Sequence, residues 1–427
     1  MDQKTVEGEQ AEGVNEQQQN MDIKQPPQIF KLNVDCFEKV FDYLSIHDLH
    51  SFGQTCKRMQ RVAGYFYHQQ FSDCFLRYNC GSIGFREYTE NLEVRARSPA
   101  DELDLVNVDW DAFKSVKRIY FRNANLDQIK MMPQEFLSRI EDVILWRCEV
   151  NGPFFEGVLG RFPNVKSLKI LASGFDDEWV TRKYPKLEHF TWFTQNSASA
   201  GKLGSFLRQN PTIRSLSTRL HLLLPNETEV MELELDDLCI RTALLQHSDC
   251  EFLNMLHAKG VYKRLHMNTE TNKTVVNRLS SLKSFVRFVG RDFTETVDLS
   301  SLVDLKVLTF NTKDISDCAN IANKPALAQS LEHLNEVNFF AAGVDDIIPF
   351  VHLSPKLKKI VVILQLGEDY YNKAIDPVAM NRERKKLLTK TLYVSKVTIY
   401  IPELNYLATR WKTTEIDLKL VEIKCIE

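Results

Sequence analysis

The sequence has no uninterrupted apolar segment of about 18 residues, the length that a membrane-spanning helix needs. We therefore expect no transmembrane helix, and the polar first residues give no signal-peptide core. The nine cysteines are scattered, and none forms a Cys-x-x-Cys pair. This pattern favours reduced thiols in the cytosol or nucleus over disulfides or a zinc site. A net charge of −3 argues against a general nucleic-acid-binding protein, which would be strongly basic.

Motifs of the common enzyme classes are also missing. The chain contains no His-Glu-x-x-His, Gly-x-Ser-x-Gly, Walker-type or protein-kinase motif. No cysteine lies in a context that would activate a thiol for ubiquitin transfer. Gly81-x-x-Gly84 lacks the further glycines of a phosphate-binding loop. We therefore expect no catalytic residues, no metal and no cofactor.

The composition that is present predicts a folded protein behind a polar leader. With 427 residues and 44% apolar content, the chain can form two or three domains or one solenoid. Residues 1–27 are rich in Gln and Glu, contain almost no large apolar residues and end in Pro26-Pro27. They predict a disordered leader.

Residues 28–75 contain three short stretches with helical periodicity. In the first, apolar residues recur at steps of three and four and predict one apolar stripe. These residues are Val34, Phe37, Val40, Phe41 and Leu44. Asn33 is a suitable N-cap for this helix. Asp48 is placed to cap a short second helix that contains Leu49 and Phe52. A third helix is expected from about Thr55, with a stripe of Cys56, Met59, Val62, Ala63 and Phe66.

Three such helices bury little surface among themselves, so we expect this segment to pack against something else. If Phe37, Phe41 and Leu44 are each buried against a partner, the contact gains on the order of 5–9 kcal/mol before the costs of association. That is enough for an interface. The alternative is an ordinary helical subdomain that packs on its own chain.

These residues resemble the F-box family. The matching parts come in order: Leu32, Phe37, Val40, Phe41, Tyr43-Leu44, Asp48-Leu49 and Thr55-Cys56-Lys57-Arg58. Two positions depart from the family pattern, since Asn33 replaces its usual Pro and Met59 its usual Trp. The resemblance implies that the segment docks on the Skp adaptor. The implied adaptor contacts are Leu32, Phe37, Val40, Phe41, Leu44, Leu49 and Met59.

From residue 116 onward one apolar pattern recurs. Its first copies are Val116-x-x-Ile119-x-Phe121, Ile140-x-x-Val143-x-Leu145, Val165-x-x-Leu168-x-Ile170 and Leu187-x-x-Phe190-x-Trp192. Further copies start near Ile213, Leu235, Tyr262, Leu282, Leu305, Leu334, Leu357, Val394 and Ile416. The mean spacing of roughly 24 residues is typical of leucine-rich repeats, in which each unit adds one short strand to a parallel stack.

The predicted fold class is α/β: a three-helix F-box, a linker or solenoid cap over residues 76–115, and degenerate leucine-rich repeats over residues 116–427. The repeats are degenerate because the expected Asn is replaced by Ala124, Cys148, Ser173 and Gln195. Of these, Cys148 and Ser173 can still supply a side-chain hydrogen bond. An insertion is expected near residues 367–393, with a basic helical run, residues 382–386, that forms a solvated face or binds a partner. The alternative is an irregular α/β domain with short parallel strands.

Residues two, four and six places after each repeat start should face away from the helices, on a concave surface. In the first repeats this surface is predicted to hold the basic and aromatic residues Arg118, Tyr120, Arg122, Trp146, Lys169, His189, Phe193, Arg219, Arg241, Arg264 and His266. Arginine pairs bidentately with carboxylate and phosphate groups. The surface therefore predicts binding of an acidic or phosphorylated protein segment.

An F-box followed by repeats resembles the substrate receptors of Skp–cullin–F-box ubiquitin ligases. The resemblance implies a non-catalytic subunit, cytoplasmic or nuclear, that binds the adaptor and through it cullin, and that holds an unknown target for ubiquitination and degradation. No nucleic-acid or membrane partner is expected. The alternative function is a repeat scaffold with no part in ubiquitination.

Overall fold

The computed structural model describes residues 32–41, 43–44, 46–71, 75–79, 82–86, 103–104, 110, 116–124, 132–150, 159–171, 174–175, 183–193, 200–293, 295–311, 320–340, 342–362, 374–413 and 418–425. The chain divides into two compact units, Met1–Phe66 and Tyr67–Glu427. The expected leader, most of the expected linker and residues 367–373 of the expected insertion lie outside the described residues.

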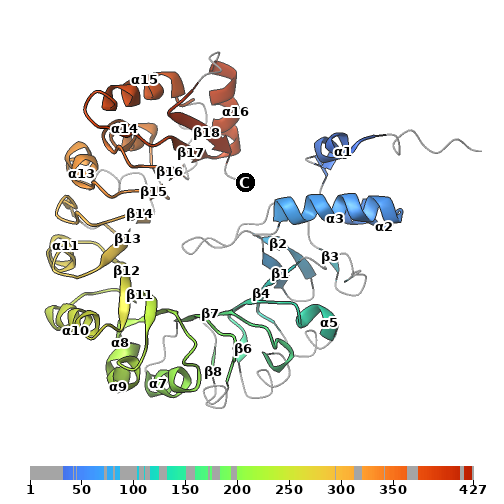
Figure 1. Cartoon of the computed structure of the whole chain (residues 1–427), viewed down its shortest axis with the longest axis horizontal. Helices are drawn as coiled ribbons and strands as arrows, with labels where there is room; N and C mark the ends of the chain where they lie inside the picture. Colours follow the sequence, from blue (N-terminus) through green and yellow to red (C-terminus); the bar gives the residue numbers. More distant parts are fainter. Residues whose placement is uncertain are drawn as a thin grey trace, which may run out of the picture. The chain divides into compact units, whose positions relative to one another are not determined.

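The first unit is helical, and its helices are α1 (Val34–Phe41), α2 (Ile46–Gln54) and α3 (Lys57–Phe71), the last of which continues past Phe66 (Figure 1). The prediction that Asn33 caps α1 is confirmed, because its Oδ1 accepts a hydrogen bond from the Cys36 backbone N–H at 2.9 Å. The prediction for Asp48 is wrong. Since α2 begins at Ile46, Asp48 lies within its first turn, where a carboxylate favours the positive end of the helix dipole.

The second unit is built on one long sheet of mixed topology. Its strands are β1 (Phe75–Asn79), β2 (Ser82–Arg86), β3 (Leu103–Asp104), β4 (Arg118–Arg122), β5 (Asp142–Trp146), β7 (Ser167–Leu171), β9 (His189–Phe193), β10 (Ser215–Arg219), β11 (Leu235–Thr242), β12 (Tyr262–Glu270), β13 (Phe285–Arg291), β14 (Val307–Asn311), β15 (Glu336–Phe339), β16 (Lys359–Val362), β17 (Val397–Ile401) and β18 (Val421–Cys425). From β4 to β18 the spatial order follows the chain order and every pair is parallel.

The segments between these strands return along one face of the sheet (Figure 1). They include α5 (Gln134–Leu137), the 3-10 helices η5 (Leu159–Arg161) and η8 (Leu224–Asn226), α7 (Ala200–Gln209), α8 (Leu220–Leu223), α9 (Glu227–Val230), α10 (His247–Ala258), α11 (Lys273–Leu279), α13 (Lys324–Ser330), α14 (Val344–Leu353), α15 (Pro377–Leu387) and α16 (Glu403–Lys412). The short strands β6 (Glu149–Val150) and β8 (Gly174–Phe175) pair separately. We call the opposite face of the long sheet, away from these helices, its inner face.

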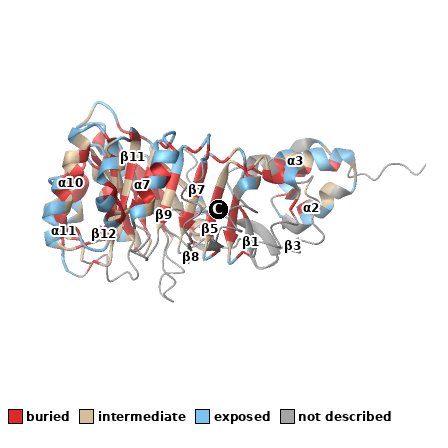
Figure 2. Cartoon of the chain, turned by 90° about the horizontal axis from the view of Figure 1, so that it is seen from below, coloured by how far each residue is buried: buried red, intermediate tan, exposed pale blue. Residues whose placement is uncertain are grey.

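Except for β13, the strands lie where the repeat pattern expects them through Val394. Most begin two residues after the first apolar position, as β4 does after Val116 and β14 after Leu305. The last expected start, Ile416, lies outside the described residues, and β18 begins only at Val421. The fourth and sixth residues of the patterns, such as Phe190 and Trp192, are buried beneath the helices. Figure 2 shows this buried layer running along the strands.

In the first seven repeats, the residue directly after the first apolar position carries a charge, and the sign alternates from one repeat to the next. We call these residues the edge row: Lys117, Glu141, Lys166, Glu188, Arg214, Asp236 and Lys263. From Lys117 to Asp236, the backbone N–H of each residue donates to the carbonyl of the residue before it in the row, at 2.7–2.8 Å. Glu141 pairs with both Lys117 (2.9 Å) and Lys166 (2.7 Å), and Lys263 pairs with Asp236 at 2.6 Å. The row therefore stabilises neighbouring repeats through opposite charges.

The basic run on α15 is not a wholly solvated face, because Arg384 is completely buried. Its guanidinium donates to the carbonyl oxygens of Val351, Ser354, Pro355, Leu357 and Ser395, at 2.7–3.3 Å. These carbonyls lie at the C-terminal end of α14, in the turn after it and before β17, where helix carbonyls lack partners within the helix. Burial lowers the pKa of Arg384 to about 10, so the group remains charged at neutral pH.

Candidate functional site

The helical unit has a closed aromatic core. Phe41 contacts Phe37 (ring centroids 5.8 Å apart), Phe52 (5.2 Å) and Phe66 (5.2 Å). Phe37 is 0% exposed and Phe41 only 2%. Arg58 lies over the Phe37 ring and donates to the Leu32 carbonyl at 3.0 Å, which fastens the segment before α1 to α3.

This core corrects the expected binding surface. Phe37, Phe41, Leu49 and Met59 were expected to contact a partner, but all four are buried inside the chain's own helical unit. The three helices bury more surface among themselves than the sequence argument allowed, because the stripes of α1 and α3 and Phe52 of α2 supply aromatic rings that meet at one point.

A smaller apolar ridge remains on the surface of the unit. Val40 is 41% exposed and Tyr43 is 89% exposed, while Leu32 and Leu44 are half-buried. A turn at the end of α1 places Val40, Tyr43 and Leu44, with the Tyr43 backbone N–H donating to the Val40 carbonyl at 3.1 Å. Of the seven predicted contacts, Val40, Leu32 and Leu44 therefore keep accessible surface. Tyr43 was part of the motif but was not among the predicted contacts.

In the sheet unit, the register brings the predicted inner-face residues into rows across the strands. One row, here called the inner row, runs Arg122, Trp146, Leu171, Phe193, Arg219, Arg241 and Asn268. The step from Phe193 to Arg219 follows from the pairing of Trp192 with Thr218, one residue earlier on each strand. Among these described positions there is no acidic residue.

Three of the predicted basic residues on this face have an aspartate on a neighbouring strand as a partner. Arg118 pairs with Asp142 at 2.7 Å, and Arg264 makes a bidentate pair with Asp237, with both contacts at 2.7 Å. Nε2 of His266 also lies 3.0 Å from Asp237. These three residues therefore contribute less positive charge to the inner face than the sequence suggested.

The aromatic residues lie at the first part of the sheet. Trp146 is half-buried, with the guanidinium carbons of Arg122 and Arg147 at 5.0 and 5.6 Å from its ring. Tyr120 is not an open surface residue as expected. It is 1% exposed and forms a small cluster with Ile144, Trp146 and Leu171. Arg241 lies 5.6 Å from the Phe193 ring, Lys169 is half-buried, and His189 is exposed.

Two arginines of the inner face escaped sequence analysis. The register between β12 and β13 shifts at Leu265/His266, which places Arg287 opposite His266 and Arg291 opposite Glu270. The apolar pattern there starts at Phe285 rather than at the expected Leu282, and Gly290 stands at its third apolar position. The sequence signal that could have located this strand, and with it Arg287 and Arg291, is Phe285-x-x-Phe288, which repeats the first half of the apolar pattern.

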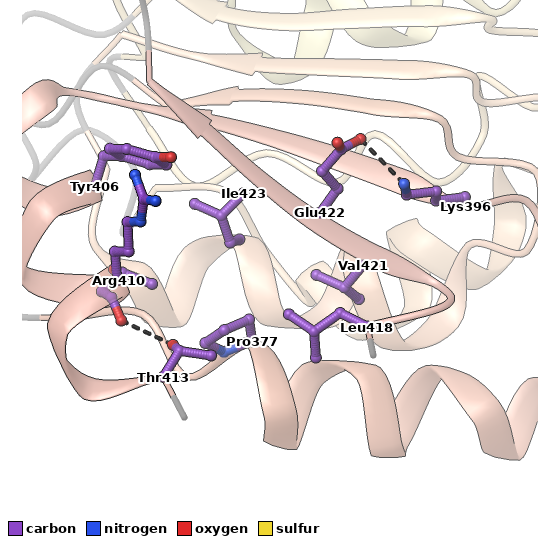
Figure 3. Close-up of a pocket in the computed structure, with 10 residues that line it drawn as sticks. Pro377, Lys396, Tyr406, Arg410, Thr413, Leu418, Val421, Glu422 and Ile423 are labelled. Carbon is purple, nitrogen blue, oxygen red and sulfur yellow. Dashed lines mark hydrogen bonds and ion pairs between the residues drawn. The ribbon is translucent and has the colours of Figure 1, made fainter. Parts of the chain in front are cut away.

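A pocket of about 510 Å³ lies at the end of the sheet unit, between α15, α16 and β18 (Figure 3). Some polar side chains of its lining already have partners within the chain. Lys396 pairs with Glu422 at 3.3 Å, and the Thr413 hydroxyl donates to the Thr409 carbonyl at 2.7 Å. Tyr406 and Arg410 lie side by side on its wall. Sequence analysis did not identify it, and its lining holds no nucleophile–base pair.

Within the described ranges, no group of three or more His, Cys, Asp or Glu side chains could hold a metal ion. The same part of the chain contains no helix that is long and apolar enough to cross a membrane. The prediction that Cys148 supplies a hydrogen bond is confirmed. Its Sγ donates to the Phe121 and Trp146 carbonyls at 3.6 Å, and burial raises the pKa of the thiol to about 11, which makes it a poor nucleophile at neutral pH.

Comparison with known families identifies the helical unit. Residues 29–67 match the family model of the F-box domain. No curated protein matches the chain at a significant level. The match supports an F-box protein, a class whose members are generally non-catalytic subunits of ubiquitin ligase complexes, and it suggests a role in binding the Skp adaptor.

Proposed function

We propose that this protein is the substrate-recognition subunit of a Skp–cullin–F-box ubiquitin ligase. The F-box unit docks on the Skp adaptor and through it on cullin, while the inner face of the sheet unit holds a target protein for ubiquitination and degradation. The chain works by proximity, since a target held near an activated thioester gains effective concentration. Such a subunit acts in the cytoplasm or nucleus.

The observation that carries the adaptor-binding part is the F-box match together with the ridge of Val40, Tyr43 and Leu44. Tyr43 is 89% exposed and Val40 is 41% exposed, so both side chains offer apolar surface to a partner. Tyrosine is also enriched at the centres of protein interfaces.

The target-binding part is supported by the topology of the sheet unit. Parallel strands in chain order, each followed by a return segment on the same face, are what a leucine-rich-repeat-like solenoid requires. In this arrangement the inner face presents side chains from many strands to one ligand. Its inner row combines aromatic and cationic residues, which are enriched at interfaces.

The docking surface is tested by replacing Val40 with Glu and Tyr43 with Ala in the full chain, followed by co-purification with the Skp adaptor and cullin. Burial of each side chain is worth about 1.5–3 kcal/mol, so the double variant should weaken adaptor binding by roughly 100-fold or more. Phe41→Ala is unsuitable, because it removes a core side chain and would unfold the unit.

The matched control is Tyr65→Ala, which removes a second exposed tyrosine from the same unit, 54% exposed on α3. It should leave adaptor binding intact. Adaptor binding that survives the Val40/Tyr43 change would contradict the docking surface. If adaptor binding holds but cullin is never recruited and no target accumulates under proteasome inhibition, the chain is a scaffold rather than a ligase subunit.

A further inference from the structure

A turn after α15 carries apolar side chains that the described part of the chain does not cover. Leu388 is 51% exposed, Tyr393 is 66% exposed, and Leu392 is fully exposed. The other exposed large apolar residues described in the sheet unit lie singly along the chain, which is ordinary for a folded protein. Three such side chains within six residues form a surface that the fold does not require.

The turn is ordered by the end of the helix before it. The backbone N–H groups of Lys390 and Thr391 donate to the Leu387 carbonyl, both at 2.9 Å, and the Thr391 hydroxyl donates to the same oxygen at 3.0 Å. Leu387 and Val394, on either side of the turn, are buried in the sheet unit. The chain thus anchors the turn at both ends and holds the three exposed side chains outward.

The cations beside these side chains are lysines. Lys385 and Lys390 are exposed, and no acidic side chain lies within 4 Å of either in the described structure. Glu383 is the one acidic residue in the described stretch 377–396, and it pairs with Lys386 at 2.7 Å. Lysines at the end of a helix favour its dipole, but that role needs no exposed leucine beside them. We call this surface the lysine–leucine turn: Lys385, Lys386, Leu388, Lys390, Leu392 and Tyr393.

The neighbouring repeats add positive charge next to the lysine–leucine turn. The Ser395 backbone N–H donates to the Pro355 carbonyl at 2.8 Å, so the end of the turn lies beside the exposed Lys356. The signs that alternate along the edge row do not continue into the later repeats. At the same position these repeats hold Lys283, Lys306, Asn335 and Lys358.

Leucine, tyrosine and lysine together suit the surface of an anionic lipid bilayer. Apolar and aromatic side chains enter the headgroup region, while lysines attract anionic lipids. Lysine is depleted at protein interfaces and arginine is enriched there, yet all three cations of this turn are lysines. A side chain as exposed as Leu392 also reaches into a flat surface, which needs no matching groove. These observations favour a membrane over a protein partner.

We propose that the lysine–leucine turn binds the surface of membranes that contain anionic phospholipids. Its three apolar side chains insert among the headgroups, and its three lysines are attracted to the lipid phosphate and carboxylate groups. The lack of a spanning segment excludes a transmembrane helix, but it does not exclude binding at the membrane surface. This inference goes beyond the proposed ligase function and does not depend on it.

The test is co-sedimentation of the purified full chain with vesicles of phosphatidylcholine, either alone or with about one third phosphatidylserine. The chain should bind the mixed vesicles at least 10-fold more tightly than the neutral ones, because each lysine near an anionic surface adds roughly a fivefold gain. A higher salt concentration should weaken this binding, since it screens the attraction between lysines and lipids.

The apolar part is tested at Leu392. Leu392→Ser should reduce binding to the mixed vesicles about 10-fold or more, because the side chain no longer gains from leaving water. Leu392→Trp should bind at least as tightly as the parent chain, since tryptophan favours the membrane interface. The matched control is Leu244→Ser, which changes another exposed leucine of the sheet unit, 65% exposed, and should bind normally.

The charged part is tested with Lys385→Gln and Lys390→Gln in one chain, which should reduce binding by about 25-fold. The matched control is Lys259→Gln with Lys273→Gln, which removes two exposed lysines elsewhere in the sheet unit. It should bind as the parent chain does. Thermal melts should show that every variant remains folded.

Failure to bind the mixed vesicles, or equal binding to the neutral ones, would overturn the proposal. An equal loss in the control variants would also overturn it, by reducing the effect to net charge or general adhesion. If the parent chain ignores vesicles and the turn variants lose a protein that co-purifies with it, the turn is a protein interface instead. Since the assay contains no adaptor, none of these outcomes affects the F-box docking test.

Discussion

In both the edge row and the inner row of the sheet unit, residues of adjacent strands lie side by side, but the two rows arrange their charges differently. In the edge row, each charge meets the opposite sign on the next repeat, as in Glu141 between Lys117 and Lys166. In the inner row, Arg219 and Arg241 carry the same sign and lie opposite each other on adjacent strands. Opposite charges across strands contribute to stability, whereas like charges oppose it. Charge pairing between strands therefore explains the edge row but not the inner row, which supports the proposal that the inner face binds a target protein.

The largest effect is expected at Arg384, which belongs to neither row and neutralises no acid. Arg384→Met would leave the carbonyls of Val351, Ser354 and Leu357 buried without donors, and should lower the free energy of unfolding by about 3–5 kcal/mol. Denaturant unfolding measures it. Arg382→Met on the same helix is the control, because Arg382 is exposed and should change stability by less than about 0.5 kcal/mol.

A similar small loss in both variants would mean that the buried guanidinium is not structurally required. A buried cation whose described partners are backbone carbonyls would then need no structural explanation.

The second prediction compares substitutions at two arginines, Arg219 at the C-terminal end of β10 and Arg214 directly before its first residue. Arg219→Gln removes repulsion from Arg241 and Arg291 and should raise the stability of the ligand-free chain by about 0.5–1 kcal/mol. Arg214→Gln removes a charge from the edge row, between Glu188 and Asp236, and should lower it by about 0.2–1 kcal/mol. Thermal melts in low-phosphate buffer compare the two variants. A loss of stability in both would show that Arg219 is a structural residue.

The smallest effect concerns pH. Hydrogen bonds from Lys166 and Lys117 lower the pKa of Glu141 below 4.5 in the folded chain, and partial burial opposes them weakly. The pair therefore contributes stability at neutral pH, which is lost as the pH falls below 4.5 and through the lowered pKa. Glu141→Gln should cost less than about 1 kcal/mol at pH 7, and the difference from the parent chain should vanish in acid. A stability difference that persists in acid would mean that Glu141 contributes through packing rather than through its charge.

Sequence alone located the strands of the long sheet from β4 to β17, apart from β13, because the apolar pattern indicates which side chains lie under the helices. It failed at β13, where Gly290 replaces an apolar residue and a register shift moves Arg287 and Arg291 onto the inner face. The apolar pattern could not mark this position, because glycine has no side chain. Pairing across strands, such as Arg264 with Asp237, also depends on register and was missed.

The errors in the helices have a common cause. An apolar stripe shows that a face is buried but not by what, so Phe37 and Phe41 were assigned to a partner when Phe52 and Phe66 of the same unit cover them. On α15 the sequence interpretation made the opposite error and placed a buried residue on a solvated face. Met380, Arg384 and Leu387 lie at steps of four and three and are all buried, so the helical spacing already placed Arg384 on the inward side.

The alternating signs of the edge row give the repeat array a parity. Loss of a single repeat, such as the one carrying Lys166, would bring Glu141 against Glu188, while loss of two consecutive repeats would restore attraction at the junction. Shortening or lengthening of this part of the chain is therefore tolerated best in even steps, and a duplicated pair of repeats would extend the array without creating a repulsive seam.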